Sequence, residues 1–74
     1  MSEIVVGGIY LHYKQQQYRV LGVARHSETL EEFVYYECLY DNPGGRYWVR
    51  PKKMFCEEVT TDQYEGPRFR LLEP

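Results

Sequence analysis

The chain has 74 residues, enough for one domain near the lower size limit of independent folding. Its formal net charge of −2 argues against a dedicated nucleic-acid or membrane-surface protein, since such proteins are usually basic. No apolar run approaches the ~20 residues of a membrane helix, and the N-terminus lacks the basic and apolar regions of a signal peptide. We therefore predict one cytoplasmic domain over residues 1–74, with its core over about residues 8–72.

Aromatic residues dominate the apolar content, with eight Tyr, three Phe and one Trp. Each ring can bury roughly 150–250 Å², so these side chains can give a short chain the dense core that offsets the entropy of folding. So many rings are more than a core of this size can hide. Some should therefore lie at the surface, and this excess is the first indication of a binding face.

Period-two alternation of apolar and polar residues predicts two strands in the first third of the chain. Residues 9–14 alternate cleanly, and the polar run 15–17 connects them to the next strand. Residues 18–25 form the second strand, with apolar side chains of both parities. Gly22 lies in its middle and can carry a bulge, which would let both parities reach a single core.

Residues 33–40 are apolar on both faces, which is typical of a central strand with core beneath it and a partly covered opposite face. Residues 41–45 are the clearest turn, because they contain a proline followed by two glycines. A fourth strand over residues 46–50 ends at Pro51, which has no backbone N–H to donate to a ladder.

Residues 52–55 can form one helical turn, and residues 67–71 alternate as a last strand with its phenylalanine and leucine inward. Short strands separated by turn residues predict an all-β fold. We expect a small antiparallel SH3-like barrel of five to six short strands, with an OB-like barrel as the alternative. Closure of the barrel would remove the exposed edges of the sheet.

Several blocks occur together in a distinctive order and spacing. They are His12-Tyr13-Lys14, Tyr18-Arg19-Val20-Leu21-Gly22, Ala24-Arg25-His26-Ser27-Glu28-Thr29, Leu39-Tyr40, Trp48-Val49-Arg50-Pro51, Met54-Phe55 and Pro67-Arg68-Phe69. In these blocks the chain resembles the small bacterial family known as domain of unknown function 1653, from about Gly8 to Phe69. The resemblance implies an SH3-like barrel and no assigned activity. One position departs from it: the family usually has glycine directly after His-Tyr-Lys, and here Gln15 stands there.

Reactive side chains are densest at Arg25-His26-Ser27-Glu28. Adjacent residues of an extended chain point to opposite faces, so His26 and Ser27 can meet only through loop geometry. No glycine-rich nucleophile turn or oxyanion-hole segment accompanies them. We therefore assign no catalytic residue, and a small hydrolase using His26 and Ser27 is the least favoured alternative.

The potential soft-metal ligands are His12, His26, Cys38 and Cys56. They contain no Cys-x-x-Cys and no closely spaced histidine pair, which are the usual zinc signatures. We predict no metal and no cofactor. Without a secretion signal, the two cysteines are predicted to be reduced thiols.

We predict a non-enzymatic binding module with an aromatic and polar groove for a peptide, a protein or a small molecule, because SH3-like barrels bind in such grooves. Trp48 would supply stacking area, Arg25 and Arg50 would receive an anionic or carbonyl group, and His26 would tune the site or donate a hydrogen bond. For each ring the competing interpretation is core packing. Nucleic acid is the alternative partner, because aromatics interleaved with arginines can stack bases; no membrane partner is expected. The predicted site residues are His12, Arg25, His26, Ser27, Glu28, Tyr36, Trp48 and Arg50.

Overall fold

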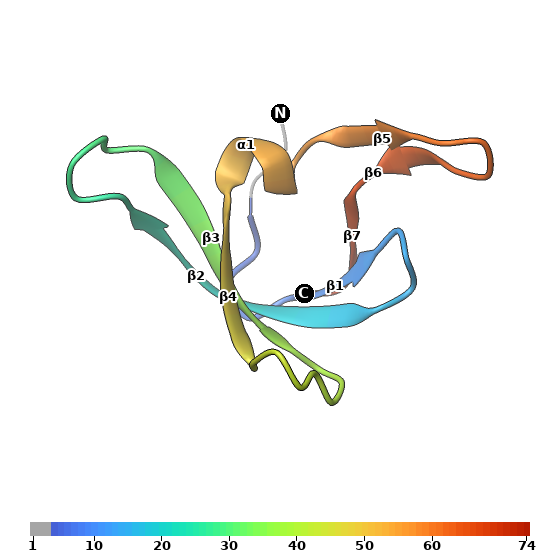
Figure 1. Ribbon diagram of the computed structural model, residues 1–74, viewed down its shortest axis with the longest axis horizontal. Helices are drawn as coiled ribbons and strands as arrows, with labels where there is room; N and C mark the ends of the chain where they lie inside the picture. The colour runs from blue at the N-terminus through green and yellow to red at the C-terminus, as the bar shows by residue number, and fades with distance from the viewer. Residues whose placement is uncertain (1–3) are drawn as a thin grey trace.

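The computed structural model describes residues 4–74; residues 1–3, part of the segment in which we predicted no signal peptide, lie outside the described residues. Within this range the elements are β1 (Ile9–His12), β2 (Gln17–Arg25), β3 (Glu32–Cys38), β4 (Tyr47–Pro51), α1 (Lys52–Phe55), β5 (Glu58–Thr60), β6 (Glu65–Pro67) and β7 (Phe69–Glu73) (Figure 1). Five strands form an antiparallel sheet in the order β4-β3-β2-β1-β7, and β5 pairs with β6. The predicted all-β class is confirmed.

A four-residue turn, residues 13–16, joins β1 to β2. His12 N–H donates to Gln16 O at 2.8 Å, and Gln15 N–H donates to His12 O at 2.7 Å. Gln15 has a φ of 77°, in the left-handed region that normally favours glycine. The turn therefore keeps a glycine-type backbone conformation although glutamine occupies the position, and this settles the hairpin geometry that the resemblance left open.

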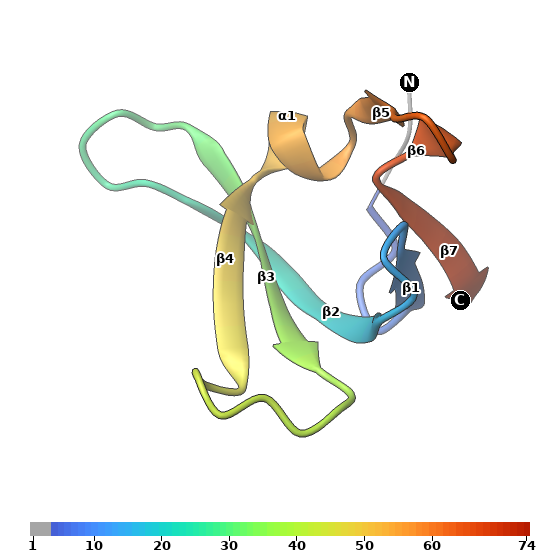
Figure 2. The ribbon, with the colours of Figure 1, turned by 45° about the vertical axis from the view of Figure 1, so that its right-hand side comes forward.

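The bulge predicted at Gly22 is present. Val20 pairs with Tyr36 and Gly22 pairs with Tyr35, so Leu21 has no partner in the ladder. Before the bulge Val20 is completely buried, but after it Val23 is 38% exposed. We expected apolar side chains from both odd and even positions of β2 to reach one core, and beyond Gly22 this expectation is wrong. A bulge increases strand twist, and the hairpin beyond it, residues 23–33 (the β2–β3 arm), extends away from the rest of the fold in Figures 1 and 2.

The core lies on one face of the five-stranded sheet, which we call the inner face, and α1 covers part of it. The predicted helical turn at residues 52–55 is present and brings Phe55 onto Phe69, with ring centroids 4.1 Å apart. Tyr10 and Tyr36 meet Phe55 at 5.3 and 5.9 Å. The buried cluster consists of Tyr10, Val20, Val34, Tyr36, Phe55 and Phe69.

The five-stranded sheet is curved but open, with β4 at one edge and β7 at the other (Figure 2). No strand pairing joins these two edges within residues 4–74, so closure into an SH3-like barrel is not confirmed. β3 is central, between β2 and β4, as predicted. On β7, Phe69 is buried as expected, whereas Leu71 is 39% exposed because it belongs to an edge strand that is not covered.

The predicted surplus of aromatic rings at the surface is confirmed. Tyr35, Tyr47 and Trp48 are 39%, 57% and 40% exposed, and all three belong to β3 or β4. The face opposite the core, which we call the outer face, carries Tyr35 and Tyr47 with ring centroids 6.2 Å apart. No helix in residues 4–74 is long and apolar enough to span a membrane.

Candidate functional site

The residues predicted to form one binding site divide into separate groups. One group, on the inner face, contains His12, Tyr36 and Arg50. A second group, at the end of the β2–β3 arm, contains Arg25, His26, Ser27 and Glu28, and Figures 1 and 2 show this arm extending away from β1. Trp48 is the direct ladder neighbour of Tyr36, but its indole is bonded to the β3–β4 turn. The structure therefore brings three of the eight residues into contact with a common set of aromatic rings.

Arg50 lies on β4 with its side chain half-buried against aromatic rings. Its Nε donates to Tyr36 Oη at 3.4 Å, and its guanidinium carbon is 5.4 Å from the centre of the Phe69 ring, within cation–π range. Among residues 4–74 it forms no ion pair and its terminal amino groups have no hydrogen-bond acceptor. The cations that do pair with a glutamate are Arg25, Arg46, Lys52 and Arg68.

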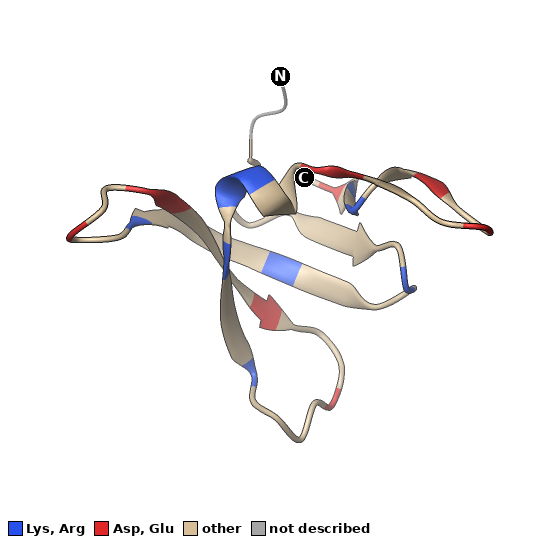
Figure 3. Cartoon of the chain, turned by 45° about the horizontal axis from the view of Figure 1, so that its top comes forward, with Lys and Arg blue, Asp and Glu red and all other residues tan. Residues whose placement is uncertain are grey.

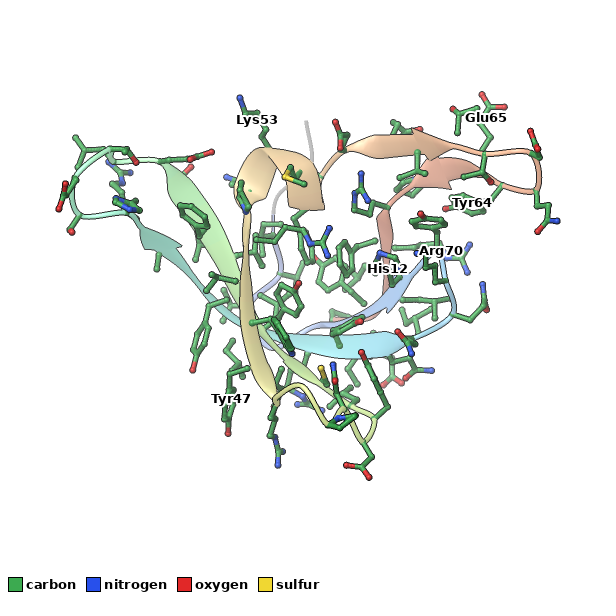
Figure 4. All side chains as sticks on the ribbon, in the orientation of Figure 1. His12, Tyr47, Lys53, Tyr64, Glu65 and Arg70 are labelled. Carbon is green, nitrogen blue, oxygen red and sulfur yellow. The ribbon has the colours of Figure 1, made fainter. Side chains whose placement is uncertain are left out.

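His12 lies on β1 and is only 8% exposed. Figure 4 shows it in the interior, between β1 and the β5–β6 hairpin. The ring meets Phe69 edge-on, with centroids 4.9 Å apart, because His12 and Phe69 are direct neighbours in the β1–β7 ladder. Its Nδ1 accepts a hydrogen bond from Lys14 N–H at 3.1 Å. A neutral imidazole in this arrangement carries its proton on Nε2, which is then a donor.

The pKa of His12 is lowered from 6.5 to about 4 by burial and by the positive charges of Arg50, Arg68 and Lys14. The imidazole is therefore neutral at neutral pH. Three cationic side chains influence this one ring, and of these only Arg68 has a carboxylate partner within the described chain. The electrostatic potential at the His12 ring is therefore positive, which favours an anionic ligand over a cationic one.

Arg68 closes the other side of the cluster. Its Nη2 pairs with Glu57 at 2.9 Å, and its Nε is buried without an acceptor. It is the one fully buried side-chain nitrogen or oxygen in residues 4–74 that has no hydrogen-bond partner. His12 Nε2 and the terminal amino groups of Arg50 also have no partner there, but they are not completely buried.

Tyr18 supports the cluster from β2. Its ring meets Tyr36 at 5.2 Å and Phe69 at 5.7 Å, both edge-on. Its hydroxyl lies 3.1 Å from the hydroxyl of Tyr40, and burial together with this hydrogen bond raises the pKa of Tyr18. We call the set His12, Tyr18, Tyr36, Arg50, Arg68 and Phe69 the arginine–aromatic cluster.

Sequence reasoning did not single out three members of this cluster, Tyr18, Arg68 and Phe69, as site residues. Each was interpreted as part of an ordinary strand, with Phe69 inward. Their convergence depends on the register of β7 against β1, which pairs residues far apart in the chain. The one local signal was the closing Pro67-Arg68-Phe69 block, where a cation precedes a buried ring.

Trp48 is on the same inner face of β4 as Arg50, since the two residues are two positions apart. Its indole Nε1 donates to Gly45 O at 3.0 Å, and the ring lies along the β3–β4 turn, next to Gly44 and Gly45. The indole is therefore held in a fixed orientation while 40% of the residue remains exposed. Trp48 therefore covers the β3–β4 turn and is not a member of the arginine–aromatic cluster.

At the end of the β2–β3 arm, His26 organises the turn through its side chain. Its Nδ1 accepts hydrogen bonds from Glu28 N–H at 3.1 Å and Thr29 N–H at 3.3 Å. Thr29 Oγ1 accepts from Glu31 N–H, as expected for a loop that satisfies its own backbone. Ser27 makes no side-chain hydrogen bond with His26 in the described chain. A hydrolase using this pair stays a prediction, and only Nε2 of the imidazole is free for it.

Cys38 and Cys56 are both free thiols. Cys38 is buried at the β3–β4 turn, and Cys56 is half-buried after α1. Within residues 4–74, no group of three or more histidine, cysteine, aspartate or glutamate side chains is close enough to hold a metal ion.

Comparison with known proteins agrees with the sequence blocks noted above. The family model described as "Protein of unknown function (DUF1653)" matches residues 8–71. A crystal structure of a protein belonging to DUF1653 from Bordetella bronchiseptica is 37% identical in sequence, with a TM-score of 0.84. The match covers 90% of this chain and 86% of that one. No curated protein sequence matches significantly. On the extent of the family match and the identity of the Bordetella protein, the chain belongs to the DUF1653 family.

Proposed function

We propose that this protein is a small non-enzymatic binding module of the bacterial cytoplasm that recognises a carboxylate group on a peptide or small molecule. The arginine–aromatic cluster is the proposed recognition site. One observation carries the proposal: Arg50 is half-buried on aromatic rings with no carboxylate partner in the described chain. A cation that loses water without gaining a counter-charge is unfavourable, so a bound anion would relieve this cost.

The donors of the cluster suit a carboxylate. The two terminal amino groups of Arg50 are unpaired within residues 4–74, and a guanidinium presents such donors in a fixed fork that matches two carboxylate oxygens. His12 adds a neutral Nε2–H donor beside them, fixed by the Lys14 N–H bond at Nδ1. A neutral donor can hydrogen-bond a carboxylate without the further desolvation cost of a second buried charge.

Aromatic side chains form the rest of the proposed site. Phe69 lies under the guanidinium, and the hydroxyl of Tyr36 holds Arg50 Nε. Because Tyr36 is itself wedged between Tyr18 and Phe55, the arginine is anchored to the core. An arginine oriented before binding loses less side-chain entropy when the ligand arrives. Of the residues predicted from the sequence, His12, Tyr36 and Arg50 belong to this proposal.

Titration of isotope-labelled protein tests it. The ligands are a short peptide with a free C-terminal carboxylate, the same peptide amidated, benzoate and inorganic phosphate. We expect the free-acid peptide and benzoate to shift the side-chain signals of Arg50 Nε and His12, and the amidated peptide to bind at least ~10-fold more weakly. If inorganic phosphate saturates the site and the carboxylate ligands do not, the ligand class would be phosphate and the carboxylate proposal would be wrong.

Arg50→Gln should weaken carboxylate binding by about 10–100-fold, since a charge-assisted hydrogen bond contributes roughly 1.5–3 kcal/mol. Arg19→Gln is the matched control. Arg19 is also half-buried and without an ion pair in the described chain, but it lies opposite Glu37 in the β2–β3 ladder, away from His12. Equal loss of binding in both variants would show that binding depends on net charge and not on the position of Arg50. The proposed site at Arg50 would then be wrong.

Nucleic-acid binding is the second proposal that the sequence suggested. Figure 3 shows Lys and Arg on several different elements, with Asp and Glu on the β2–β3 arm and the β5–β6 hairpin. Phosphate backbones are usually bound by a clustered basic stripe, so this distribution favours the carboxylate proposal. Binding of a single-stranded oligonucleotide, with an affinity that falls steeply as salt is added, would favour the nucleic-acid proposal over the carboxylate proposal.

A further inference from the structure

We propose that two copies of this chain associate through β4, which pairs antiparallel with β4 of the second copy around a two-fold axis at Trp48. This proposal is independent of carboxylate binding. It rests on the exposed edge of β4, on the side chains that this edge presents, and on an apolar pocket beside it.

β4 is an edge strand with a continuous apolar run. Tyr47, Trp48 and Val49 are consecutive and are 57%, 40% and 58% exposed. Exposed hydrophobic edge strands usually pair or carry protective charges. The opposite edge, β7, has Arg70 and Glu73 among its apolar residues, whereas the one charge of β4, Arg50, follows an uncharged run over residues 47–49. Of the two edges, β4 is therefore the one suited to pairing.

The backbone groups of β4 fix the register. Cys38 N–H donates to Arg46 O at 2.9 Å, and the ladder then pairs Tyr36 with Trp48. Backbone groups alternate in direction along an antiparallel strand. Those of residues 46, 48 and 50 therefore point toward β3, and those of Tyr47 and Val49 point away from the sheet.

Pro51 limits the number of usable registers, because it has no N–H to donate. When Tyr47 pairs with Val49 of the second copy, Val49 pairs with Tyr47 of the second copy by symmetry. Each of these two pairs exchanges two backbone hydrogen bonds, and no outward N–H is left without an acceptor. A shift by two residues in either direction loses one of these pairs, or places Pro51 where a donor is needed.

The side chains of residues 47–49 complement themselves in the same register, and the charge of Arg46, which would lie opposite Arg50 of the second copy, is already paired with Glu37. On the outer face, the Tyr47 ring projects away from β4 (Figure 4) and would lie against Val49 of the second copy. Beside Val49 is a pocket of about 240 Å³, also lined by Ala24, Phe33, Arg25 and His26. An exposed ring and an apolar pocket on one face, exchanged by a two-fold axis, are the features of an isologous interface. The two copies of Trp48 would face each other on the inner side.

The size of this interface predicts weak association. Tyr35, Tyr47 and Trp48 are 39%, 57% and 40% exposed, so each has on the order of 100 Å² left to bury. With Val49 and the edge backbone, the total approaches the lower limit of specific interfaces, roughly 1,000 Å². We expect a dissociation constant on the order of tens of micromolar.

Sedimentation equilibrium over about 5 µM to 1 mM protein tests the association. The molar mass should rise from the monomer value of 8.9 kDa toward twice that value and no further. Val49→Lys should raise the dissociation constant at least ~10-fold. Leu72→Lys, at a residue of the β7 edge that is 40% exposed, should leave it unchanged. A monomer at the highest concentration, masses beyond a dimer, or equal effects of the two substitutions would overturn the proposal.

Amide exchange of the unmodified protein gives a second readout that needs no variant. Protection of the Tyr47 and Val49 amides should increase with protein concentration, while protection of Trp48 and Arg50, already paired with β3, should not. Association that leaves the Tyr47 and Val49 amides unprotected would overturn the β4 pairing. A monomer in which these two amides become protected only when an extended peptide is added would assign the edge to peptide binding instead, and would likewise overturn the dimer.

Discussion

The rings of Phe55 and Phe69 stack face to face, 4.1 Å between centroids and 6° from parallel. Phe55 comes from the helical turn after β4, and Phe69 begins β7. No backbone pairing connects β4 to β7 in the described chain, and this stack is one of the contacts that link the two edges of the sheet, together with the Arg50 guanidinium over Phe69. It also fixes the ring on which Arg50 lies.

Truncation of Phe55 should therefore be severely destabilising. Phe55→Ala is expected to lower the free energy of unfolding by about 3–5 kcal/mol, the usual cost of removing a buried phenylalanine. In a small domain this is a large share of the total stability. Urea denaturation monitored by circular dichroism measures the change. Met54→Ala, at a neighbour that is 40% exposed, should change stability by no more than about 0.5 kcal/mol. Since alanine favours the helix, similar losses in both variants would mean that burial of the Phe55 ring is not what makes α1 stabilising.

Gln15 offers a stabilising substitution. Its φ of 77° costs a non-glycine residue about 1 kcal/mol, so Gln15→Gly should stabilise the fold by roughly 0.5–1 kcal/mol. The net gain is limited because glycine also increases the freedom of the unfolded chain. Gln16→Gly is the control, since Gln16 has no positive φ and should be destabilised by glycine. A loss of stability in Gln15→Gly would show that the Gln15 side chain, which reaches Tyr13 O at 3.5 Å, contributes more than the strain costs.

The lowered pKa of His12 links stability to pH. The unfolded chain takes up a proton near pH 6.5, but the folded protein does so only near pH 4. Between these values the unfolded state binds more protons, so stability falls as the pH falls and levels off below about 4. The loss is about 3 kcal/mol at roughly 1.4 kcal/mol per pH unit.

Denaturation of His12→Asn across the same pH range isolates this contribution, because asparagine offers an oxygen near the position of Nδ1 to accept the Lys14 N–H. The variant should lose most of the slope between pH 6.5 and 4. His26→Asn, on the exposed arm, should keep it. Bound carboxylate should oppose the effect of Arg50 and Arg68 and move the His12 titration upward, which two-dimensional spectra of the imidazole can follow.

Asn42 organises the β3–β4 turn with both ends of its amide. Its Oδ1 accepts Gly44 N–H at 2.9 Å, and its Nδ2 donates to Tyr40 Oη at 3.2 Å and approaches Cys38 Sγ at 3.6 Å. Asn42→Ala should cost about 1–2 kcal/mol. Asn42→Asp keeps the acceptor for Gly44 and should cost less. Because Trp48 Nε1 bonds to Gly45 O in the same turn, the fluorescence of the chain's one tryptophan should shift in the alanine variant and not in the aspartate variant.

Local patterns were sufficient for five of the seven strands, for the bulge at Gly22 and for the helical turn at residues 52–55. The β5–β6 hairpin was not predicted, because residues 60–66 were interpreted as a turn. Openness of the sheet was not predictable, because strand count does not determine whether the last strand reaches the first. Whether Val23 and Leu71 are covered depends on that same question, and both are exposed.

The candidate site was only partly predictable for a related reason. His12, Tyr36 and Arg50 were selected by residue type, and the structure assembles them around Phe69. The separation of Arg25 and His26 from this cluster follows from the length of β2 beyond its bulge. Two consecutive segments of one strand can have different neighbours. The side-chain pattern of β2 alone does not show at which residue the core that covers it ends.

The bulge at Leu21 therefore divides β2 into two segments with different dynamics. The segment containing Tyr18 and Val20 is anchored in the core, whereas the β2–β3 arm has its base at Val34 and few buried side chains beyond it. Local opening energies follow such differences in burial, so amides of the arm should exchange with solvent while those of Tyr18 and Val20 remain closed. The arginine–aromatic cluster belongs to the slowly opening segment, and the pocket beside Val49 is lined by the rapidly opening one. Ordering of the arm by a second copy would then carry an entropic cost that ligand binding at Arg50 does not.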